Sequence, residues 1–104
     1  MRVLSWGGNA MLKGQATRKV EGGKLVTVEV FYSNTIEKVR VTGDFFIHPE
    51  EGLEDVEQTF VGVDISSSVE GMTDLIEQVV TAKQIMMIGV SPKVIAAVVM
   101  EALH

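Results

Sequence analysis

Few residues of this sequence have side chains that could perform chemistry. Of the two histidines, His104 is the last residue and His48 lies at a predicted strand-to-helix junction. A metal site made of His48, Glu50 and Glu51 is disfavoured, because residues that directly follow a helix-capping histidine rarely converge on one ion. We interpret His48 instead as a capping residue at the start of a helix.

No set of residues indicates a catalytic site. A serine–histidine–aspartate set can be assembled on paper from His48, Asp44 and a serine, but no serine has the sequence context of a nucleophile elbow. The absence of cysteine excludes a disulfide framework, a thiolate zinc site and a cysteine-held iron–sulfur cluster. We therefore predict no catalytic residues and no metal site in this chain.

One segment has a phosphate-like signal, the glycine pair Gly22-Gly23 followed by Lys24. It lacks the G-x-x-x-x-G-K-[ST] spacing of a phosphate-binding loop, and it lies in a predicted hairpin rather than between a strand and a helix. As a hairpin turn it requires no ligand. Arg18 and Lys19 lie just upstream, however, so the hairpin tip is positive and suits an anion or an acidic partner. The sequence leaves both interpretations open.

The elements that position these residues are predicted to be strands first and helices afterwards. Alternation of apolar and polar residues predicts strands at 13–20, 24–32 and 36–46, joined as an antiparallel meander. Residues 1–12 show a turn signal but no sustained periodicity, so they fit a short first strand, a flexible lead or a foreign remnant. We divide the chain into a poorly defined N-terminal leader, 1–12, and one domain, 13–104.

Three helices are predicted after the meander. The first is Pro49–Val61, with proline at the first helical position and acids in the first turn. The second starts at Ser67, where Glu70 completes a capping box, and the third starts at Ser91-Pro92. The apolar run 85–89 can end the second helix or form a buried connector.

The fold class follows from one face of the meander. That face needs a cover, which the helices can supply. The prediction is an α+β domain in which a three-stranded antiparallel sheet is followed by three helices packed on one face. The inward residues of the sheet are expected to be Val26, Val28, Val30, Val39 and Val41.

Composition limits the partners. A chain of 104 residues fits one domain, and its 46% of hydrophobic residues is high for that size, so some apolar surface is either packed or left for a partner. Phe45-Phe46 fits the core, and any exposed part would form an apolar docking patch. The net charge of −5 argues against nucleic acid, and no apolar run approaches the ~18 residues of a membrane span. Without a signal-peptide pattern at the start, the expected location is cytoplasmic.

Three motifs carry a resemblance to a known family. Residues 19–28, KVEGGKLVTV, residues 41–50, VTGDFFIHPE, and the segment Gly89-Val90-Ser91-Pro92 with Ile95 resemble the accessory domain of lipoate–protein ligases. In bacteria this domain is usually the C-terminal part of the ligase, and in some archaea it is a separate small subunit. The likeness covers about residues 13–104. Glu21 stands where the family usually has proline, which makes the turn less rigid.

The resemblance implies both a fold and a function. The family's accessory domain has a small α/β fold similar to iron–sulfur scaffold proteins. Lipoate–protein ligases use ATP to convert lipoate to lipoyl-adenylate and then transfer the lipoyl group to a lysine of an acceptor domain. The catalytic lysine and the nucleotide loops belong to the large domain, which this chain is too short to contain.

By this resemblance, the chain is a non-catalytic accessory subunit. It is expected to form a heterodimer with the catalytic subunit and to enable the adenylation step, with lipoyl-acceptor domains as indirect partners. ATP, Mg²⁺ and lipoate are expected in the complex, and no cofactor is expected on this chain alone. Residues of the hairpin, Gly22, Gly23 and Lys24, are expected to contact the adenylate pocket. The expected partner interface is Lys19, Lys24, Asp44, Phe45, Phe46 and His48.

Three alternatives remain. The chain can be a stand-alone binding or dimerising module with the same fold and no role in lipoylation. It can be an autonomous enzyme, which the shortage of acid–base and nucleophilic groups disfavours. It can also be the excised C-terminal domain of a longer ligase.

Overall fold

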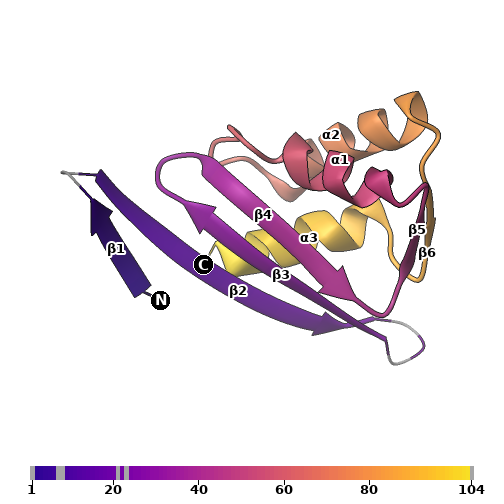
Figure 1. Ribbon diagram of the computed structural model, residues 1–104, viewed down its shortest axis with the longest axis horizontal. Helices are drawn as coiled ribbons and strands as arrows, with labels where there is room; N and C mark the ends of the chain where they lie inside the picture. Colours follow the sequence, from indigo (N-terminus) through magenta and orange to yellow (C-terminus); the bar gives the residue numbers. More distant parts are fainter. Residues whose placement is uncertain (1, 7–8, 21, 23, 104) are drawn as a thin grey trace.

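The computed structural model describes residues 2–6, 9–20, 22 and 24–103. Strands occupy the first half of the chain and helices the second, with one short strand between the last two helices (Figure 1). In chain order the elements are β1 (Arg2–Trp6), β2 (Asn9–Lys19), β3 (Leu25–Tyr32), β4 (Ile36–Gly43), β5 (Phe46–His48), α1 (Glu51–Thr59), α2 (Val69–Ala82), β6 (Met86–Ile88) and α3 (Pro92–Ala102).

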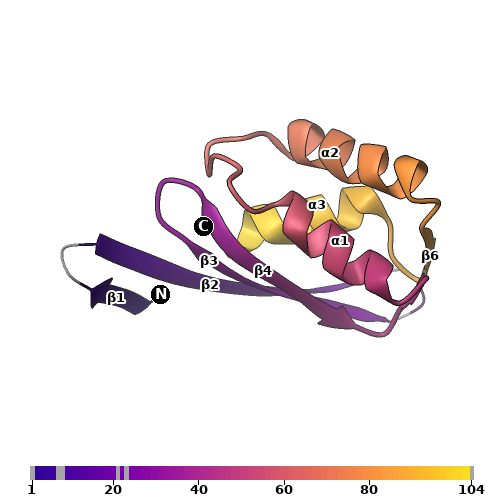
Figure 2. The ribbon, with the colours of Figure 1, turned by 45° about the horizontal axis from the view of Figure 1, so that its top comes forward.

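The main sheet confirms the predicted α+β class. Among the described residues its strand order is β1-β2-β3-β4, all neighbours are antiparallel, and the three helices lie on one face (Figure 2). The predicted meander is β2, β3 and β4, and β1 adds a further strand beside β2. The short first strand considered for residues 1–12 corresponds to β1, and β2 begins at Asn9. The division of the chain between residues 12 and 13 stays a prediction.

The hydrophobic core lies between this sheet and the helices. The predicted inward residues Val26, Val28, Val30, Val39 and Val41 are at most 4% exposed, which confirms the predicted face of the sheet. Helix α3 covers β2 and β3, α1 covers β4, and α2 packs on the other two helices. None of the described helices is both long enough and apolar enough to cross a membrane.

The helix starts are partly as predicted. The Ser91 side chain caps α3 by accepting a hydrogen bond from the Val94 N–H at 3.2 Å, which confirms the third start. The predicted start at Ser67 is wrong by one residue. Ser68 is the N-cap of α2 and accepts from the Gly71 N–H at 3.0 Å, because Ser68 has the extended backbone (ψ 160°) that aims a cap oxygen at the first turn.

The predicted capping role of His48 is also wrong. His48 is the last residue of β5, and α1 begins at Glu51 with Glu50 as an N-cap that makes no side-chain capping bond. The reason is a long-range pairing, since β5 is held by β6, and the chain therefore stays extended through His48 before it can turn into a helix.

The predicted strand 36–46 also ends early. Strand β4 stops at Gly43, and Phe46 begins the separate strand β5. Gly43 has φ +154° and lies so close to the Leu25 backbone that a side chain at position 43 would overlap it. Position 43 therefore has no room for a side chain, and β4 ends there.

Helix α3 approaches the sheet closely at Gly14. A Cβ atom built at Gly14 would overlap the carbonyl oxygen of Ala102, and it would also lie 3.4 Å from Cγ1 of Val30. The helix therefore rests on bare backbone in the middle of β2. Glycine is needed here for space rather than for an unusual backbone angle.

We predict that Gly14→Ala destabilises the domain by about 1–3 kcal/mol, because α3 must shift away from β2 to make room for the methyl group. The free energy of unfolding is measured by urea denaturation. Gln15→Ala, one residue further on the exposed face of the same strand, is the matched control and should change the unfolding free energy by less than about 0.5 kcal/mol. Equal unfolding midpoints for the two variants would contradict this account of the packing.

Candidate docking surface

The site residues predicted from the sequence gather at the end of the sheet where β3 begins and β4 ends. There the Asp44 N–H donates to the Leu25 carbonyl at 2.9 Å, and the Leu25 N–H donates to Oδ2 of Asp44 at 3.4 Å. The β2–β3 hairpin closes just beyond, with the Val20 N–H donating to the Lys24 carbonyl at 2.7 Å. Asp44 therefore ties the base of the hairpin to the turn that ends β4.

The segment before α3 reaches the same place. Gly89 has φ +87°, and a Cβ atom there would lie 3.2 Å from the Asp44 carbonyl oxygen, 3.4 Å from Cα of Phe45 and 3.5 Å from Cδ of Lys24. Three motifs that are far apart in sequence, the glycine–lysine hairpin, the aspartate–phenylalanine turn and the segment that begins at Gly89, therefore meet at one end of the molecule.

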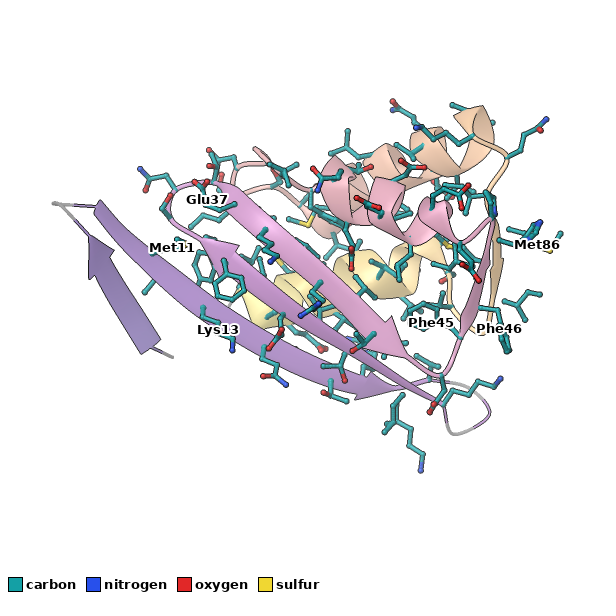
Figure 3. The ribbon with its side chains drawn as sticks, viewed as in Figure 1. Met11, Lys13, Glu37, Phe45, Phe46 and Met86 are labelled. Carbon is teal, nitrogen blue, oxygen red and sulfur yellow. The ribbon has the colours of Figure 1, made fainter. Side chains whose placement is uncertain are left out.

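A two-stranded ribbon, β5 with β6, presents large apolar side chains at this end. Phe46 pairs with Ile88 and His48 pairs with Met86, so these four residues share one face of the ribbon. Phe46 is 73% exposed, Met86 57% and Ile88 54%. Figure 3 shows Phe46 and Met86 projecting from the ribbon away from the body of the molecule. We call the exposed face, made of Phe46, His48, Met86 and Ile88, the tip patch.

The opposite face of the ribbon anchors it to the domain. Ile47 and Met87 alternate with the tip-patch residues and pack against the core. Helix α1 comes close here because Gly52 has no side chain, and a Cβ at Gly52 would be 3.1 Å from both Ile47 and Ile85. The tip patch thus lies on the exposed face of a ribbon whose opposite face packs against the core.

The two adjacent phenylalanines have different environments. Phe45 is half-buried and packs against the core, whereas Phe46 is in solvent. The predicted core role is confirmed for Phe45. Phe46 is exposed, as the alternative of an apolar docking patch requires, and its role in docking stays a prediction. Exposed aromatic and long aliphatic side chains in one group are characteristic of a protein-binding surface.

Two of the predicted cations, Lys19 and Lys24, lie at this end of the molecule, whereas Arg18 forms an ion pair with Glu101 on α3. Lys24 is exposed beside Gly89, and Lys19 is exposed opposite Leu25 in the last pair of β2 and β3. Gly22 has φ +85° with open space around it, as a turn residue would. Gly23 lies outside the described residues. The structure therefore brings Lys19, Lys24, Asp44, Phe45, Phe46 and His48 to one end, and their role in binding a partner stays a prediction.

Sequence reasoning missed Met86 and Ile88. The run 85–89 is neither the end of α2 nor a wholly buried connector, because residues 86–88 form β6 and two of the three are exposed. A short apolar run between Gln84 and Gly89 is compatible with a strand, but its length alone cannot separate a strand from a helix end. The missing signal was the partner strand, about forty residues earlier in the chain.

Among the described residues, no group of three histidine and acidic side chains converges as metal ligands would. The pKa of Asp64 is lowered by hydrogen bonds from the side chain and the backbone N–H of Ser66. Asp64 lies beside Thr35 at the other end of the sheet, where these bonds shape a loop.

A groove of about 560 Å³ runs between β4 and α1. In it the Val41 N–H donates to Oε2 of Glu57 at 2.7 Å, so α1 pairs part of the edge of β4. The groove mixes charges of both signs and contains no histidine or serine. Its lining residues are Glu37, Lys38, Val39, Arg40, Glu50, Leu53, Glu54, Glu57, Gln58 and Val61.

The fold of this chain is similar to that of a solved protein, whereas its sequence matches no family model. No protein-family model and no curated protein match this sequence. Among solved structures, the chain is similar to one from Thermoplasma acidophilum, described in a structural analysis of an archaeal lipoylation system that comprises a bipartite lipoate protein ligase and its E2 lipoyl domain. The TM-score is 0.68 at 23% sequence identity, and the match covers 90% of this chain and 97% of the other. The chain therefore shares its fold with a component of that lipoylation system.

Proposed function

We propose that this chain is the non-catalytic accessory subunit of a two-part lipoate–protein ligase. It docks on the catalytic subunit and enables ATP-dependent activation of lipoate to lipoyl-adenylate, which the catalytic subunit then transfers to a lysine of an acceptor domain. The observation that carries the proposal is that the three motifs of the family resemblance meet at one end of the fold, beside an exposed apolar patch.

The fold comparison supports a role in lipoylation, without specifying which component of the system this chain is. The Thermoplasma chain belongs to a system that contains a bipartite ligase and a lipoyl domain, and its whole fold matches this one. The motifs at Lys24, Asp44 and Gly89 resemble those of the ligase accessory part, which favours that component over the lipoyl domain.

The tip patch has the properties that docking requires. Removing a large apolar side chain from water contributes about 1.5–3 kcal/mol, and Phe46, Met86 and Ile88 all retain more than half of their surface for a partner. The ribbon is held by its inner face, so little conformational freedom is lost when the outer face is covered. Lys24 lies at the border, where its charge can act on the phosphates of a neighbouring nucleotide pocket.

A docking subunit can accelerate adenylation without a reacting group of its own. The reaction needs ATP, Mg²⁺ and lipoate held in an ordered pocket from which water is excluded. Loops around such a pocket lose activity when they move, and a rigid partner that covers them raises the population of the ordered state. ATP, Mg²⁺ and lipoate are accordingly assigned to the complex rather than to this chain.

The tip patch also provides a test of the alternative function, a stand-alone dimerising module. If two copies paired through Phe46, Met86 and Ile88, the isolated chain would be a dimer. We expect a monomer that pairs one-to-one with the catalytic subunit, as sedimentation equilibrium with and without that subunit can determine.

Phe46→Asp is expected to weaken binding to the catalytic subunit by about 30-fold or more, because it places a charge in the centre of an apolar interface. Binding is measured by isothermal titration calorimetry. Phe46 is exposed, so the variant should unfold at the temperature of the unchanged protein. Leu75→Asp, at a 37% exposed position on α2, is the matched control and should bind normally. Similar affinities for the two variants would show that the tip patch is not part of the interface.

Lys24→Ala is expected to slow lipoyl-adenylate formation by about tenfold while the complex still forms, which corresponds to about 1.4 kcal/mol of lost transition-state stabilisation. The rate is followed by pyrophosphate release from ATP in the reconstituted complex. Lys93→Ala, on the exposed surface of α3, is the control and should have no effect. An unchanged rate for Lys24→Ala would show that the hairpin does not act on the pocket. Full activity of the catalytic subunit alone would refute the accessory role itself.

A further inference from the structure

Charge is divided between the two layers of this protein. The helices α1 and α2 carry seven carboxylates and no basic residue. Among the described side chains of β2, β3 and β4, the paired rows on the face that no helix covers contain four basic residues and one carboxylate, although the whole chain has a net charge of −5. The residues of this open face, row by row across β2, β3 and β4, are Lys13, Phe31 and Lys38, then Gln15, Glu29 and Arg40, then Thr17, Thr27 and Thr42, and finally Lys19 and Leu25.

The single carboxylate of the open face is already engaged. Oε2 of Glu29 lies 3.3 Å from Nζ of Lys13, and the same Nζ lies 5.7 Å from the centre of the Phe31 ring. Arg40 is directly opposite Glu29 in the strand register, yet within the described part of the chain neither Arg40 nor Lys38 has an ion-pair partner. The outer strand β4 therefore presents two cations that form no ion pair, although both also line the groove in which Glu50, Glu54 and Glu57 of the α1 side lie.

The spacing of these cations matches an extended chain. Lys38 and Arg40 are two residues apart on one strand, so they project from the same face about 7 Å apart. Carboxylates on alternate residues of an extended peptide have the same spacing. Phe31 is half-buried on β3, next to Lys38, and offers a flat apolar contact beside the two cations.

We infer that the open face of the sheet binds an acidic, extended segment of a partner protein, with Lys38, Arg40 and Phe31 at its centre. The surface is separate from the tip patch, because its cations lie on β4 and its aromatic ring on β3, whereas the tip patch lies on β5 and β6. The inference does not depend on the role of the chain in lipoylation.

A protein segment fits this face better than a nucleic acid. A long polyanion would extend past β4 toward α1, which packs on β4 and carries four carboxylates that would repel it. A nucleic-acid surface also needs more phosphate contacts than two free cations supply. A short acidic segment can stay on the open face and avoid this repulsion.

The test uses a fluorescein-labelled decaglutamate peptide and the full chain, with binding measured by fluorescence anisotropy at low and at physiological salt. We expect measurable binding that weakens as salt is added, and a loss of at least tenfold in affinity for the double variant Lys38→Glu/Arg40→Glu. Both side chains are exposed, so the variant is expected to keep its unfolding temperature.

The matched control is Lys83→Glu/Lys93→Glu, which makes the same change in net charge on the helical layer and should retain at least half of the affinity. Equal losses for the two double variants would show that only net charge matters, and would overturn the inference. No binding by the unchanged protein at low salt would overturn it as well. Tighter binding of a decamer of single-stranded DNA than of decaglutamate would assign the face to nucleic acid instead.

Discussion

The two hydrogen bonds between Asp44 and the backbone of Leu25 hold the turn at which the main sheet stops and the chain leaves for the β5–β6 ribbon. Gly43 comes so close to the Leu25 backbone that a side chain at position 43 would overlap it, and Asp44 then holds the chain in the turn. The following residues leave the sheet and form β5, which pairs with β6 and so draws the start of α3 to the same place. The hairpin lysine, the tip patch and Gly89 all owe their positions to this one turn.

The same arrangement separates the buried core from the exposed apolar residues of the tip patch. The alternating valines of β3 and β4, covered by α3 and α1, supply much of the core, and the exposed residues of the tip patch are not part of it. In the β5–β6 ribbon, inward and outward residues alternate in the same way. Ile47 and Met87 face inward, and Phe46, Met86 and Ile88 face solvent. Apolar surface can therefore be exposed for a partner without weakening the core. This explains how so small a chain can be so rich in hydrophobic residues.

The layers also differ in charge, which gives the protein two distinct faces. Acids on α1 and α2 keep the helical surface hydrated and repel polyanions. Lys13, Lys19, Lys38 and Arg40 on β2 and β4 face the other way, and among these four described bases only Lys13 is held in an ion pair. An accessory subunit that is bound by its tip would keep its open sheet face free for a second contact.

The sequence alone determined the layer architecture, since alternation with a period of two fixes which strand residues are inward and the cap at Ser91 fixes a helix start. It also indicated each site motif separately, including Lys24, Asp44 and Phe46. Only the tertiary structure decided that β5 pairs with β6, that Phe45 is partly buried while Phe46 is exposed, and that His48 belongs to a strand rather than a helix cap. The physical reason is that periodicity reports which face a residue is on, whereas a contact between residues forty positions apart depends on how the intervening helices pack, which no local pattern encodes.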